Sequence, residues 1–385
     1  MRVVRKLLPT VLACVLLFGV TAPYTVYADE ITVIINDQPL ELTGQAPTIV
    51  DGQAFVPIRP VFEAIGFDVN WSEHTGSAII RRDNWIIRIT PGSYIFIENG
   101  INYSLEVPAQ NIGGSLMMPA RAVLERADHD LHWDEDTRTL TVEATDFRSL
   151  AEMGDAHAQS RLARSYHITG DDAQGLYWHR RAADQGWLAS QSALGALYLL
   201  GIGTEQDFDQ AGYRLSIALE QDTPGAQVNT GLMYYMGWGV AQDFERAMYW
   251  FRLSAEQGYA MAYNNIGVMY RDGNGTARDY VQAAYWFERG AELGNVLAAL
   301  SLGVMYAGGQ GMEQDYERAV YWFRTAAELG SASAQNNLGV MYQNGNGVTQ
   351  SYQQASYWFW RAIDQGYANA LLNLADLPPQ YILGS

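Results

Sequence analysis

The sequence predicts a multidomain α+β protein, in which a β-rich, duplicated α+β module precedes a right-handed α-solenoid of helical hairpins. Three observations predict this architecture. Apolar and polar residues alternate from about residue 31 to residue 144, as in half-buried strands. The same region is similar to itself at an offset of 62 residues, and the chain beyond residue 150 repeats every 36 residues. Alternation indicates sheets, and a period of this length indicates stacked helix pairs.

Residues 1–28 have the pattern of a secretory signal peptide. Two arginines and Lys6 precede an apolar run, and a small-residue cleavage site ends at Ala28. Pro23 interrupts the run, which is too short for a membrane anchor. We expect a secreted, extracellular mature protein with no stable membrane insertion, and association with the cell surface stays open. Cys14 leaves a lipoprotein as the alternative.

The mature chain lacks the residues for several kinds of chemistry. Cys14 and Lys6 are the only cysteine and lysine of the full sequence, and both lie in the predicted signal peptide, so the mature chain has neither. This excludes disulfides, thiolate nucleophiles and lysine Schiff bases. Residues 1–28 hold three basic and no acidic residues, so 21 basic and 42 acidic residues remain and the net charge is about −21. Such a surface repels nucleic acid and anionic lipid, so we expect no nucleic-acid partner.

Residues 29–144 form the first predicted domain, with two half-units at about 31–92 and 93–144. The segments FVPIRPVFEAIGFDVNWSEHT (55–75) and MMPARAVLERADHDLHWDEDT (117–137) align at the offset of 62. Each predicts a strand, a short helix and a hairpin, and Asn99-Gly100 predicts a further hairpin turn. Identical pairs include Pro57/Pro119, Arg59/Arg121, Val61/Val123, Glu63/Glu125, Asp68/Asp130, Trp71/Trp133 and Thr75/Thr137.

In each half, an arginine and a glutamate stand four residues apart on the predicted helix, where they can pair along one face. We interpret the arginine as organising the helix and loop of its own half. The histidines of DHDLHW (128–133) suggest a metal site. However, the first half has Phe67, Asp68 and Asn70 at the matching positions, so the duplicated fold does not require histidine. We therefore predict no bound metal and no cofactor.

The doubled pattern VPIRxVFEAIGxxVxW resembles the copper amine oxidase N-terminal-like domain over residues 31–144. This module is common on secreted proteins of Gram-positive bacteria. The resemblance implies a stalk or surface-attachment domain, without the copper ligands or the quinone cofactor of the oxidase. It assigns no catalytic residue to this chain.

Residues 145–377 are predicted to form about six helical hairpins, and residues 378–385 a C-terminal tail. A first copy around Tyr166 is shorter by four residues, which predicts a contracted turn between its two helices, and Pro378-Pro379 ends the last helix. The recurring residues are Gly195, Gly231, Gly267, Gly303 and Gly339; Tyr198, Tyr234, Tyr270, Tyr306 and Tyr342; and Trp250, Trp286, Trp322 and Trp358, with Tyr213 near the corresponding place of the second repeat.

Each recurring residue type has a structural explanation. The glycine lets two helices approach closely, and a GxG loop reverses the chain where positive φ is needed. The Asp or Ser before each second helix is expected to cap it, and a Gln three residues later to complete a capping box. Because a catalytic constellation should occur once, we interpret these columns as packing. The predicted caps are Asp207, Asp243, Asp279, Asp315 and Ser351, and the glutamines are Gln210, Gln282 and Gln354.

The unit LGxMYxxGxGVxxDxxxAxYWFxxAAExG resembles the Sel1-like repeat, a relative of the tetratricopeptide repeat, over residues 150–377. The resemblance implies a protein-interaction scaffold in a secreted or signalling assembly. Some cysteine-rich members bind or hydrolyse β-lactams, but they depend on a disulfide in every repeat. The mature chain has no cysteine for such bonds.

A polar ladder on the first helices is the candidate partner-binding site. Equivalent positions of stacked repeats line up along a concave face, where amides can bond to the backbone of an extended peptide. The alternative is that each asparagine bonds its own neighbouring turn. The candidates are Asn229, Asn264, Asn265, Ser301, Asn336 and Asn337, together with Trp238 in a loop where other repeats carry Ile, Asn or Gln.

These observations give three functional hypotheses. The leading one is a non-enzymatic scaffold, secreted or on the cell surface, that binds a protein or extended peptide through the concave face. The second is binding of cell-wall glycan such as peptidoglycan through exposed aromatic rings. The third is a hydrolase, although GxSxG, HExxH and phosphate-loop motifs are absent from the sequence. The aromatic candidates for glycan binding are Trp71, Trp85, Trp133, Trp187 and Trp238.

Overall fold

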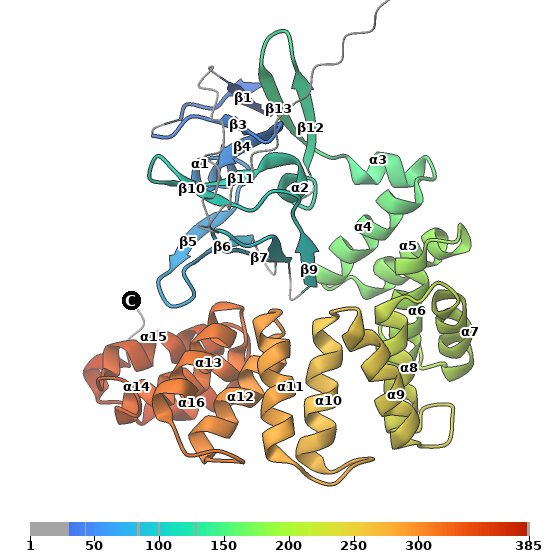
Figure 1. The fold of residues 1–385 in the computed structure, drawn as a ribbon, viewed down its shortest axis with the longest axis vertical. Helices are drawn as coiled ribbons and strands as arrows, with labels where there is room; N and C mark the ends of the chain where they lie inside the picture. The colour runs from blue at the N-terminus through green and yellow to red at the C-terminus, as the bar shows by residue number, and fades with distance from the viewer. Residues whose placement is uncertain (1–30, 43, 83–84, 99–100, 128, 383–385) are drawn as a thin grey trace, which may run out of the picture.

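A computed structural model of the chain describes residues 31–382, apart from residues 43, 83–84, 99–100 and 128. Figure 1 shows the sheets of the N-terminal module on one side of a curved row of helices. The predicted signal peptide and the Asn99-Gly100 turn lie outside the described residues. Within the described part, no helix combines the length and the apolar character needed to span a membrane.

The described residues of the module form three sheets and two short helices. The strand orders are β12-β13-β1-β2, β10-β11-β4-β3 and β5-β6-β7-β8-β9. Strands β1 and β13 are parallel, and the other neighbours in these sheets are antiparallel. The elements are β1 (Thr32–Ile35), β2 (Gln38–Pro39), β3 (Thr48–Val50), β4 (Gln53–Pro57), α1 (Ile58–Ala64), β5 (Asp68–Ser72), β6 (Ser77–Arg82), β7 (Trp85–Ile89), β8 (Ile95–Glu98), β9 (Ile101–Ser104), β10 (Gln110–Ile112), β11 (Ser115–Pro119), α2 (Ala120–Leu124), β12 (His129–Asp134) and β13 (Thr139–Ala144).

A pseudo-two-fold axis in the second sheet relates the two half-units. Strands β4 and β11 pair so that Val56 lies opposite Met118, its own counterpart at the offset of 62. One half consists of β3, β4, α1, β5 and β6, and the other of β10, β11, α2, β12 and β13. This is the predicted unit of strand, helix and hairpin. The expected division near residues 92–93 falls between β7 and β8, which pair in one sheet because β7–β9 extend the β5–β6 hairpin.

A large apolar core joins the three sheets and both helices of the module, and a smaller cluster surrounds Phe55 and Met117. The burial of β7 alternates along the strand, as expected for a strand with one face on the core. Phe62 of α1 meets Phe67 edge to face, with ring centroids 5.3 Å apart. Val123 and Leu124 of α2 are fully buried in the same cluster. Both short helices are therefore held by the side chains that face the sheets.

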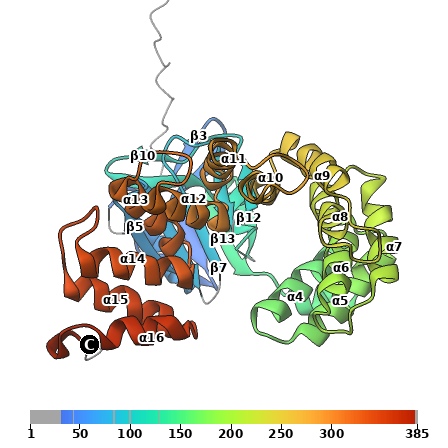
Figure 2. The same cartoon turned by 90° about the horizontal axis from the view of Figure 1, so that it is seen from below.

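The rest of the chain is a helical solenoid of six hairpins, from α4/α5 to α14/α15. Figure 2 shows its curved path, with α7 on the outer side. The turn within the first hairpin is contracted as predicted: residues 169–171 join α4 to α5, whereas residues 201–207 join the two helices of the second hairpin. The helices are α3 (Phe147–Glu152), α4 (Ala156–Ile168), α5 (Asp172–Asp184), α6 (Leu188–Leu200), α7 (Phe208–Leu219), α8 (Pro224–Met236), α9 (Phe244–Glu256), α10 (Ala260–Asp272), α11 (Tyr280–Glu292), α12 (Val296–Gly308), α13 (Tyr316–Glu328), α14 (Ala332–Asn344), α15 (Tyr352–Ile363), α16 (Ala368–Ala375) and the 3₁₀ helix η1 (Pro379–Tyr381).

Glycines set the helix contacts within and between repeats. A Cβ atom on Gly267 would lie 2.7 Å from the ring of Phe287 in the second helix of the same hairpin. A Cβ atom on Gly275, the second glycine of the GxG loop, would lie 2.6 Å from Phe244 in the preceding repeat. The predicted close approach is confirmed, and the loop glycine adds a contact between repeats.

The second helices are capped as predicted, but the capping boxes do not close. Asp279 accepts a hydrogen bond from the backbone N–H of Gln282 at 3.0 Å. The backbone N–H of Asp279 donates to the carbonyl of Tyr270 at 2.9 Å, so the Gln282 side chain is not needed there. The same cap and the same bond to the repeat tyrosine occur at Asp207, Asp243, Asp315 and Ser351.

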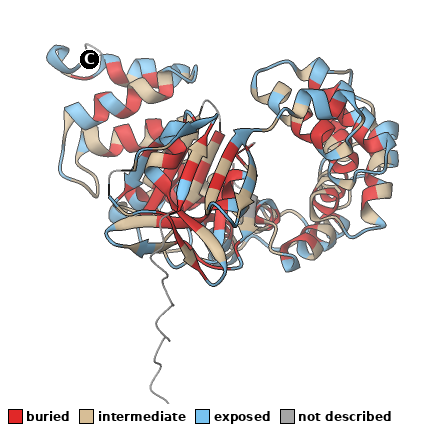
Figure 3. Cartoon of the chain, turned by 90° about the horizontal axis from the view of Figure 1, so that it is seen from above, coloured by how far each residue is buried: buried red, intermediate tan, exposed pale blue. Residues whose placement is uncertain are grey.

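The module contacts the first and fifth repeats of the solenoid, and Ile97 of β8 lies against Gly294 at the end of the fourth repeat. At the first repeat, Arg164 Nη2 of α4 lies 3.4 Å from Glu98 Oε1 of β8. At the fifth repeat, Ser72 donates to Glu328 at 2.6 Å, and His74 Nε2 lies 2.9 Å from Thr325 Oγ1. Figure 3 shows the module in front of the gap between the two arms of the curve. The module therefore contacts repeats that lie far apart along the solenoid. We call its contact with α13 the closure.

Candidate partner-binding surface

The ladder residues fall into two groups. Asn229, Asn265, Ser301 and Asn337 are half-buried on successive first helices, whereas Asn264 and Asn336 are only 6% and 7% exposed. A buried amide cannot offer its whole hydrogen-bonding edge to a peptide. Only the first four therefore form a surface row, which we call the amide row, and its role in partner binding stays a prediction.

Hydrogen bonds tie part of this ladder to the preceding repeat. Asn229 Nδ2 donates to the carbonyl of Ser192 at 3.4 Å. At the end of the solenoid, Asn373 donates to Asn336 Oδ1 at 2.7 Å. These bonds join neighbouring first helices. The alternative hypothesis, in which each asparagine bonds its own neighbouring turn, does not describe them. In the fourth repeat, Asn264 Oδ1 and Asn265 Nδ2 are buried without a hydrogen-bond partner among the described residues.

Apolar side chains lie on both sides of the amide row. Positions four residues before and three and seven residues after it share one face of each first helix. Five large apolar residues at these positions are at least 41% exposed, which is more than core packing explains. We call this surface the first-helix face. Its exposed apolar members are Leu200, Met236, Met261, Leu297 and Val304.

Trp238 is half-buried and does not stand free in its loop. Its ring stacks on Phe208 of the preceding repeat, with centroids 6.3 Å apart and an interplanar angle of 15°. At the equivalent position of the next repeat, Asn274 Nδ2 donates to the hydroxyl of Tyr235 at 2.8 Å. The loop position therefore serves contacts between repeats in both copies, and a role for Trp238 in partner binding stays a prediction.

The repeat tyrosines are held by arginines of the neighbouring second helices. Arg324 donates to the Tyr342 hydroxyl at 2.6 Å, and Arg180 to the Tyr198 hydroxyl at 3.0 Å. A second tyrosine row, which the sequence analysis did not separate from the tryptophan column, is 42–58% exposed on the second helices. Its members are Tyr177, Tyr213, Tyr249, Tyr285, Tyr321 and Tyr357.

Tyr213 belongs to this exposed row, and Arg214 occupies the tryptophan position of the second repeat. The Arg214 side chain is 15% exposed and lies 3.1 Å from Asp184 Oδ1. The expected placement of Tyr213 in the tryptophan column was therefore wrong by one residue. The guanidinium fills the groove and is neutralised by the preceding repeat.

Buried glutamines form a polar contact that was not predicted from the sequence. Gln335 is fully buried, and its Nε2 donates to the carbonyl of Ala327 at the end of the previous helix, at 3.1 Å. Gln159 and Gln191 make the same bond eight residues back. At this position Tyr263 replaces glutamine and bonds through its hydroxyl instead. Because the residue type changes between copies, the column is hard to recognise in the sequence.

The contact between the module and α13 buries charged groups. Burial and the nearby Arg324 guanidinium lower the pKa of His74 to about 4. Burial raises the pKa of Glu328, although hydrogen bonding from Ser72 and the arginines around it partly offset this. Burial also lowers the pKa of Arg88, which faces Tyr321 and Glu328. The interface is therefore polar and sensitive to protonation.

One serine and histidine pair has the composition of a nucleophile and a base. His179 Nδ1 lies 3.0 Å from Ser190 Oγ, and the His179 ring stacks on His167. Ser190 is fully buried, so no substrate reaches it. Burial, followed by His167 and Arg164, lowers the pKa of His179 to about 3. This pair fixes the packing of α5 on α6.

The histidines considered for a metal site lie apart. His129 is buried, with its Nδ1 2.6 Å from the carbonyl of Ala127. His132 is three residues further along β12 and points to the other face of the strand. Within residues 31–382 as far as they are described, no group of three or more His, Cys, Asp or Glu side chains is arranged to hold a metal ion.

The tryptophans proposed for glycan contact differ in exposure. Trp85 is buried and donates to Glu98 at 3.0 Å, so it cannot stack on a sugar. Trp187 is 37% exposed beside His157. Trp71 is 42% exposed and Trp133 is half-buried, each on the strand that follows a short helix of the module.

This architecture defines an α-solenoid of helical repeats joined to an N-terminal β-rich domain. A family model of the copper amine oxidase N-terminal domain matches residues 34–142. A model of the Sel1 repeat matches six segments that together cover more than half of the chain. They are residues 156–187, 188–220, 224–259, 260–295, 296–331 and 332–367. The chain belongs to the Sel1 repeat family, and Sel1 repeat proteins are typically protein-interaction scaffolds.

Solved structures of Sel1 repeat proteins are similar to this chain. A protective antigen of uropathogenic Escherichia coli is 37% identical, with 62% of this chain and 52% of that chain covered and a TM-score of 0.47. This chain thus spans about half of that protein's length. A Sel1 repeat protein from Oxalobacter formigenes is 31% identical, with coverage of 55% and 89% and a TM-score of 0.48. An immunity protein from Pseudomonas aeruginosa is 18% identical, with coverage of 58% and 89% and a TM-score of 0.44.

Proposed function

We propose that this protein is a secreted, non-enzymatic scaffold that binds an extended segment of a partner protein on its first-helix face. The observation that carries the proposal is the exposure of large apolar residues on both sides of the amide row. Leu297 is 56% exposed, Val304 is 45% exposed, and Ser301 lies between them on α12. Exposed apolar patches beside polar groups are typical of protein-binding surfaces.

The arrangement suits an extended peptide. The Asn337 amide and the Ser301 hydroxyl can each donate to one peptide backbone group and accept from another. Asn229 and Asn265 contribute side-chain oxygens, because their Nδ2 groups are bonded or buried. Such a row holds a backbone without selecting its sequence. The apolar side chains on either side then provide contacts for alternating side chains of the peptide. The module contacts the second helix α13 and the first helix α4, whereas the exposed apolar members of the first-helix face lie on α6, α8, α10 and α12. Secretion is supported by the signal pattern of residues 1–28.

The test compares capture by matched variants. The mature chain, residues 29–385, is immobilised and exposed to envelope and medium proteins of the producing cells. We expect a protein that the wild type captures to be lost with the triple variant Met261→Glu, Leu297→Glu, Val304→Glu. The control, Val281→Glu with Tyr249→Glu, alters residues that are 63% and 58% exposed on second helices and should capture normally.

Calorimetry with the captured protein then measures the contribution of the amide row. Replacing Asn265 and Asn337 with Ala should weaken binding about tenfold, which corresponds to about 1.4 kcal/mol. Circular dichroism checks that helicity is unchanged. An identical set of captured proteins for the wild type and the triple variant, with both folded, contradicts the proposal.

A further inference from the structure

The module contains two cavities that are copies of each other. Pocket A, of about 460 Å³, lies between the β3–β4 hairpin of one half and α2 and β12 of the other, and its lining includes Gln53, Arg121 and Trp133. Pocket B, of about 270 Å³, lies between β10–β11 and α1 and β5, and its lining includes Ser115, Arg59 and Trp71. Each of the three residues of pocket A has its counterpart in pocket B at the offset of 62.

The pseudo-two-fold axis explains this doubling. Because β4 pairs with β11 through equivalent residues, the hairpin of each half reaches over the helix and strand of the other half. Each pocket therefore combines parts of both halves and forms only when the halves pair. The tryptophan persists in both copies although Trp71 is 42% exposed, and core packing does not require an indole ring at the surface.

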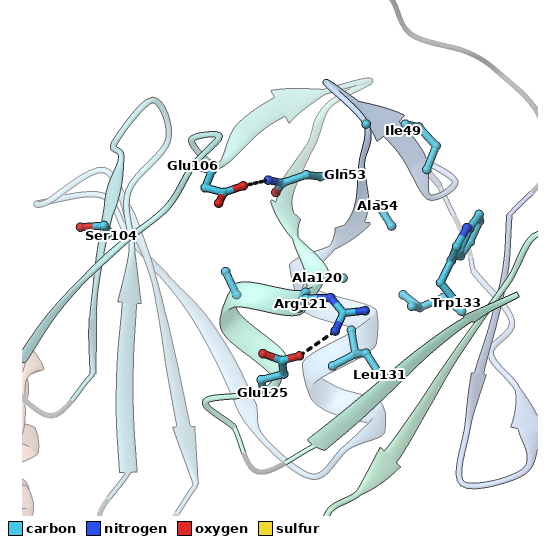
Figure 4. A pocket seen from close by; sticks show the side chains of 13 residues that line it. Ile49, Gln53, Ala54, Ser104, Glu106, Ala120, Arg121, Glu125, Leu131 and Trp133 are labelled. Atoms are coloured by element: carbon cyan, nitrogen blue, oxygen red, sulfur yellow. Dashed lines mark hydrogen bonds and ion pairs between the residues drawn. The ribbon is translucent and has the colours of Figure 1, made fainter. Parts of the chain in front are cut away.

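Pocket A combines an aromatic ring with paired donors and acceptors. Figure 4 shows Arg121 and Trp133 around the same space, with Gln53 and Glu106 across from them. Arg121 Nη1 lies 3.0 Å from Glu125 Oε1, and Gln53 Nε2 donates to Glu106 Oε2 at 2.7 Å. The Arg121 and Glu125 side chains are 66% and 48% exposed, so both present further hydrogen-bonding groups to a ligand.

These groups match the chemistry of a sugar ring. A pyranose with equatorial hydroxyls has an apolar C–H face that packs on an indole ring. Its hydroxyls both donate and accept, so they pair with a guanidinium, a carboxylate and an amide at once. The two carboxylates of pocket A and the net charge of about −21 disfavour an anionic ligand. Small-ligand pockets usually enclose roughly 300–1,000 Å³, and pocket A falls in this range.

We propose that the module binds a neutral glycan chain of pyranose units at pockets A and B, with pocket A as the stronger site. Pocket A is larger, and its lining includes the carboxylates of Glu106 and Glu125, whereas the described lining of pocket B includes no carboxylate. In pocket B, Arg59 Nη1 also donates to the carbonyl of Val69 at 2.7 Å, which occupies a donor that a sugar would use. The glycan site is independent of the first-helix face, since it belongs to the module alone.

The experiment titrates the intact mature chain with chitotetraose and with cellotetraose by calorimetry. Probe concentrations reach about 10 mM, which would saturate most of a site with a Kd of about 1 mM. We expect binding to two sites of unequal affinity. Trp133→Ala should weaken the stronger site at least about tenfold, Trp71→Ala should abolish the weaker one, and the double variant should not bind. Tyr94→Ala, which removes a 56% exposed ring elsewhere on the module, should bind like the wild type.

A further variant and an anionic probe test the pocket independently of the tryptophans. Arg121→Met alters an exposed side chain and should weaken the stronger site even if a tryptophan variant does not fold. An anionic oligogalacturonate should bind more weakly than the neutral probes. The proposal is overturned if neither neutral probe binds, if the double variant binds like the wild type, or if the anionic probe binds equally well. Partner capture through the first-helix face should persist in the double variant, so failure of one proposal is distinguishable from failure of the other.

Discussion

Repeat glycines determine how closely paired helices approach. In the first helix α10, Gly267 faces the ring of Phe287, and an added Cβ atom would lie 2.7 Å from it. Gly267→Ala should therefore destabilise the solenoid by about 1–3 kcal/mol, the usual cost of overpacking a core. Urea denaturation followed by circular dichroism measures the change.

Gly212 provides the matched control for this substitution. It also lies inside a helix, but a Cβ atom there would be 3.9 Å from its nearest neighbour, the methyl group of Met233. Gly212→Ala should stabilise the protein by about 0.5–1 kcal/mol, because alanine favours the helix. If the two substitutions changed the free energy of unfolding equally, the effect of the repeat glycine would come from helix propensity and not from the contact between the helices.

At the level of the helix, only one of the two hydrogen bonds of the expected capping box forms. In the described part of the chain, the Asp or Ser side chain caps the second helix, and the Gln three residues later makes no return bond. Asp279 accepts from the N–H of Gln282, while its own N–H donates to Tyr270. Asp279→Ala should destabilise the protein by about 1 kcal/mol, as loss of an N-cap usually does. Gln282→Ala should be nearly neutral because no capping box forms. Urea denaturation measures the free energy of unfolding of both variants. A similar decrease for the two would show that the Gln282 side chain does take part in a capping box.

The repeated parts of the fold could be predicted from the sequence, whereas contacts that occur once could not. Repetition identifies the helix pairs, their caps and the glycine contacts, because each appears several times at one spacing. It does not identify pocket A, which is lined by Gln53 and Arg121 from opposite halves of the module. It also misses the contact of Ser72 with Glu328, 256 residues apart, because a single polar contact leaves no period in the sequence.

The candidate surface was predictable only in part for a similar reason. The ladder positions follow from the period, but exposure depends on which side of the helix packs on the neighbouring repeat. Asn264 and Asn265 are adjacent in sequence, yet one is buried and the other lies on the first-helix face. The apolar residues on either side of the row vary between Met, Leu and Val, so they do not form a recognisable column.

For the whole molecule, the closure between the module and α13 depends on buried ionisable groups. The His74 ring lies 4.3 Å from the Tyr321 ring and bonds to Thr325, and α13 also brings Arg324 and Glu328 to this contact. A charged His74 would stand beside the Arg324 guanidinium with little solvent to screen it. The module should therefore dock on α13 with His74 neutral.

This predicts that docking weakens as the pH falls from 6.5 towards 4. The pKa of docked His74 is about 4 against an ordinary value of 6.5, so in this window the undocked histidine takes up a proton that the docked one does not. Docking is fully retained above pH 6.5. Glu328 acts in the opposite sense because burial raises its pKa, and protonation of this carboxyl favours the docked state.

A variant separates the two contributions. Hydrogen exchange of residues 321–328, corrected for the intrinsic effect of pH, should show protection falling in the wild type between pH 6.5 and 4.5. His74→Phe retains a ring against Tyr321 but cannot take up a proton, so its protection should not fall in this window and should rise if Glu328 dominates. His132→Phe, in β12 and away from α13, should behave like the wild type. Parallel pH profiles for the wild type and His74→Phe would show that His74 does not control closure.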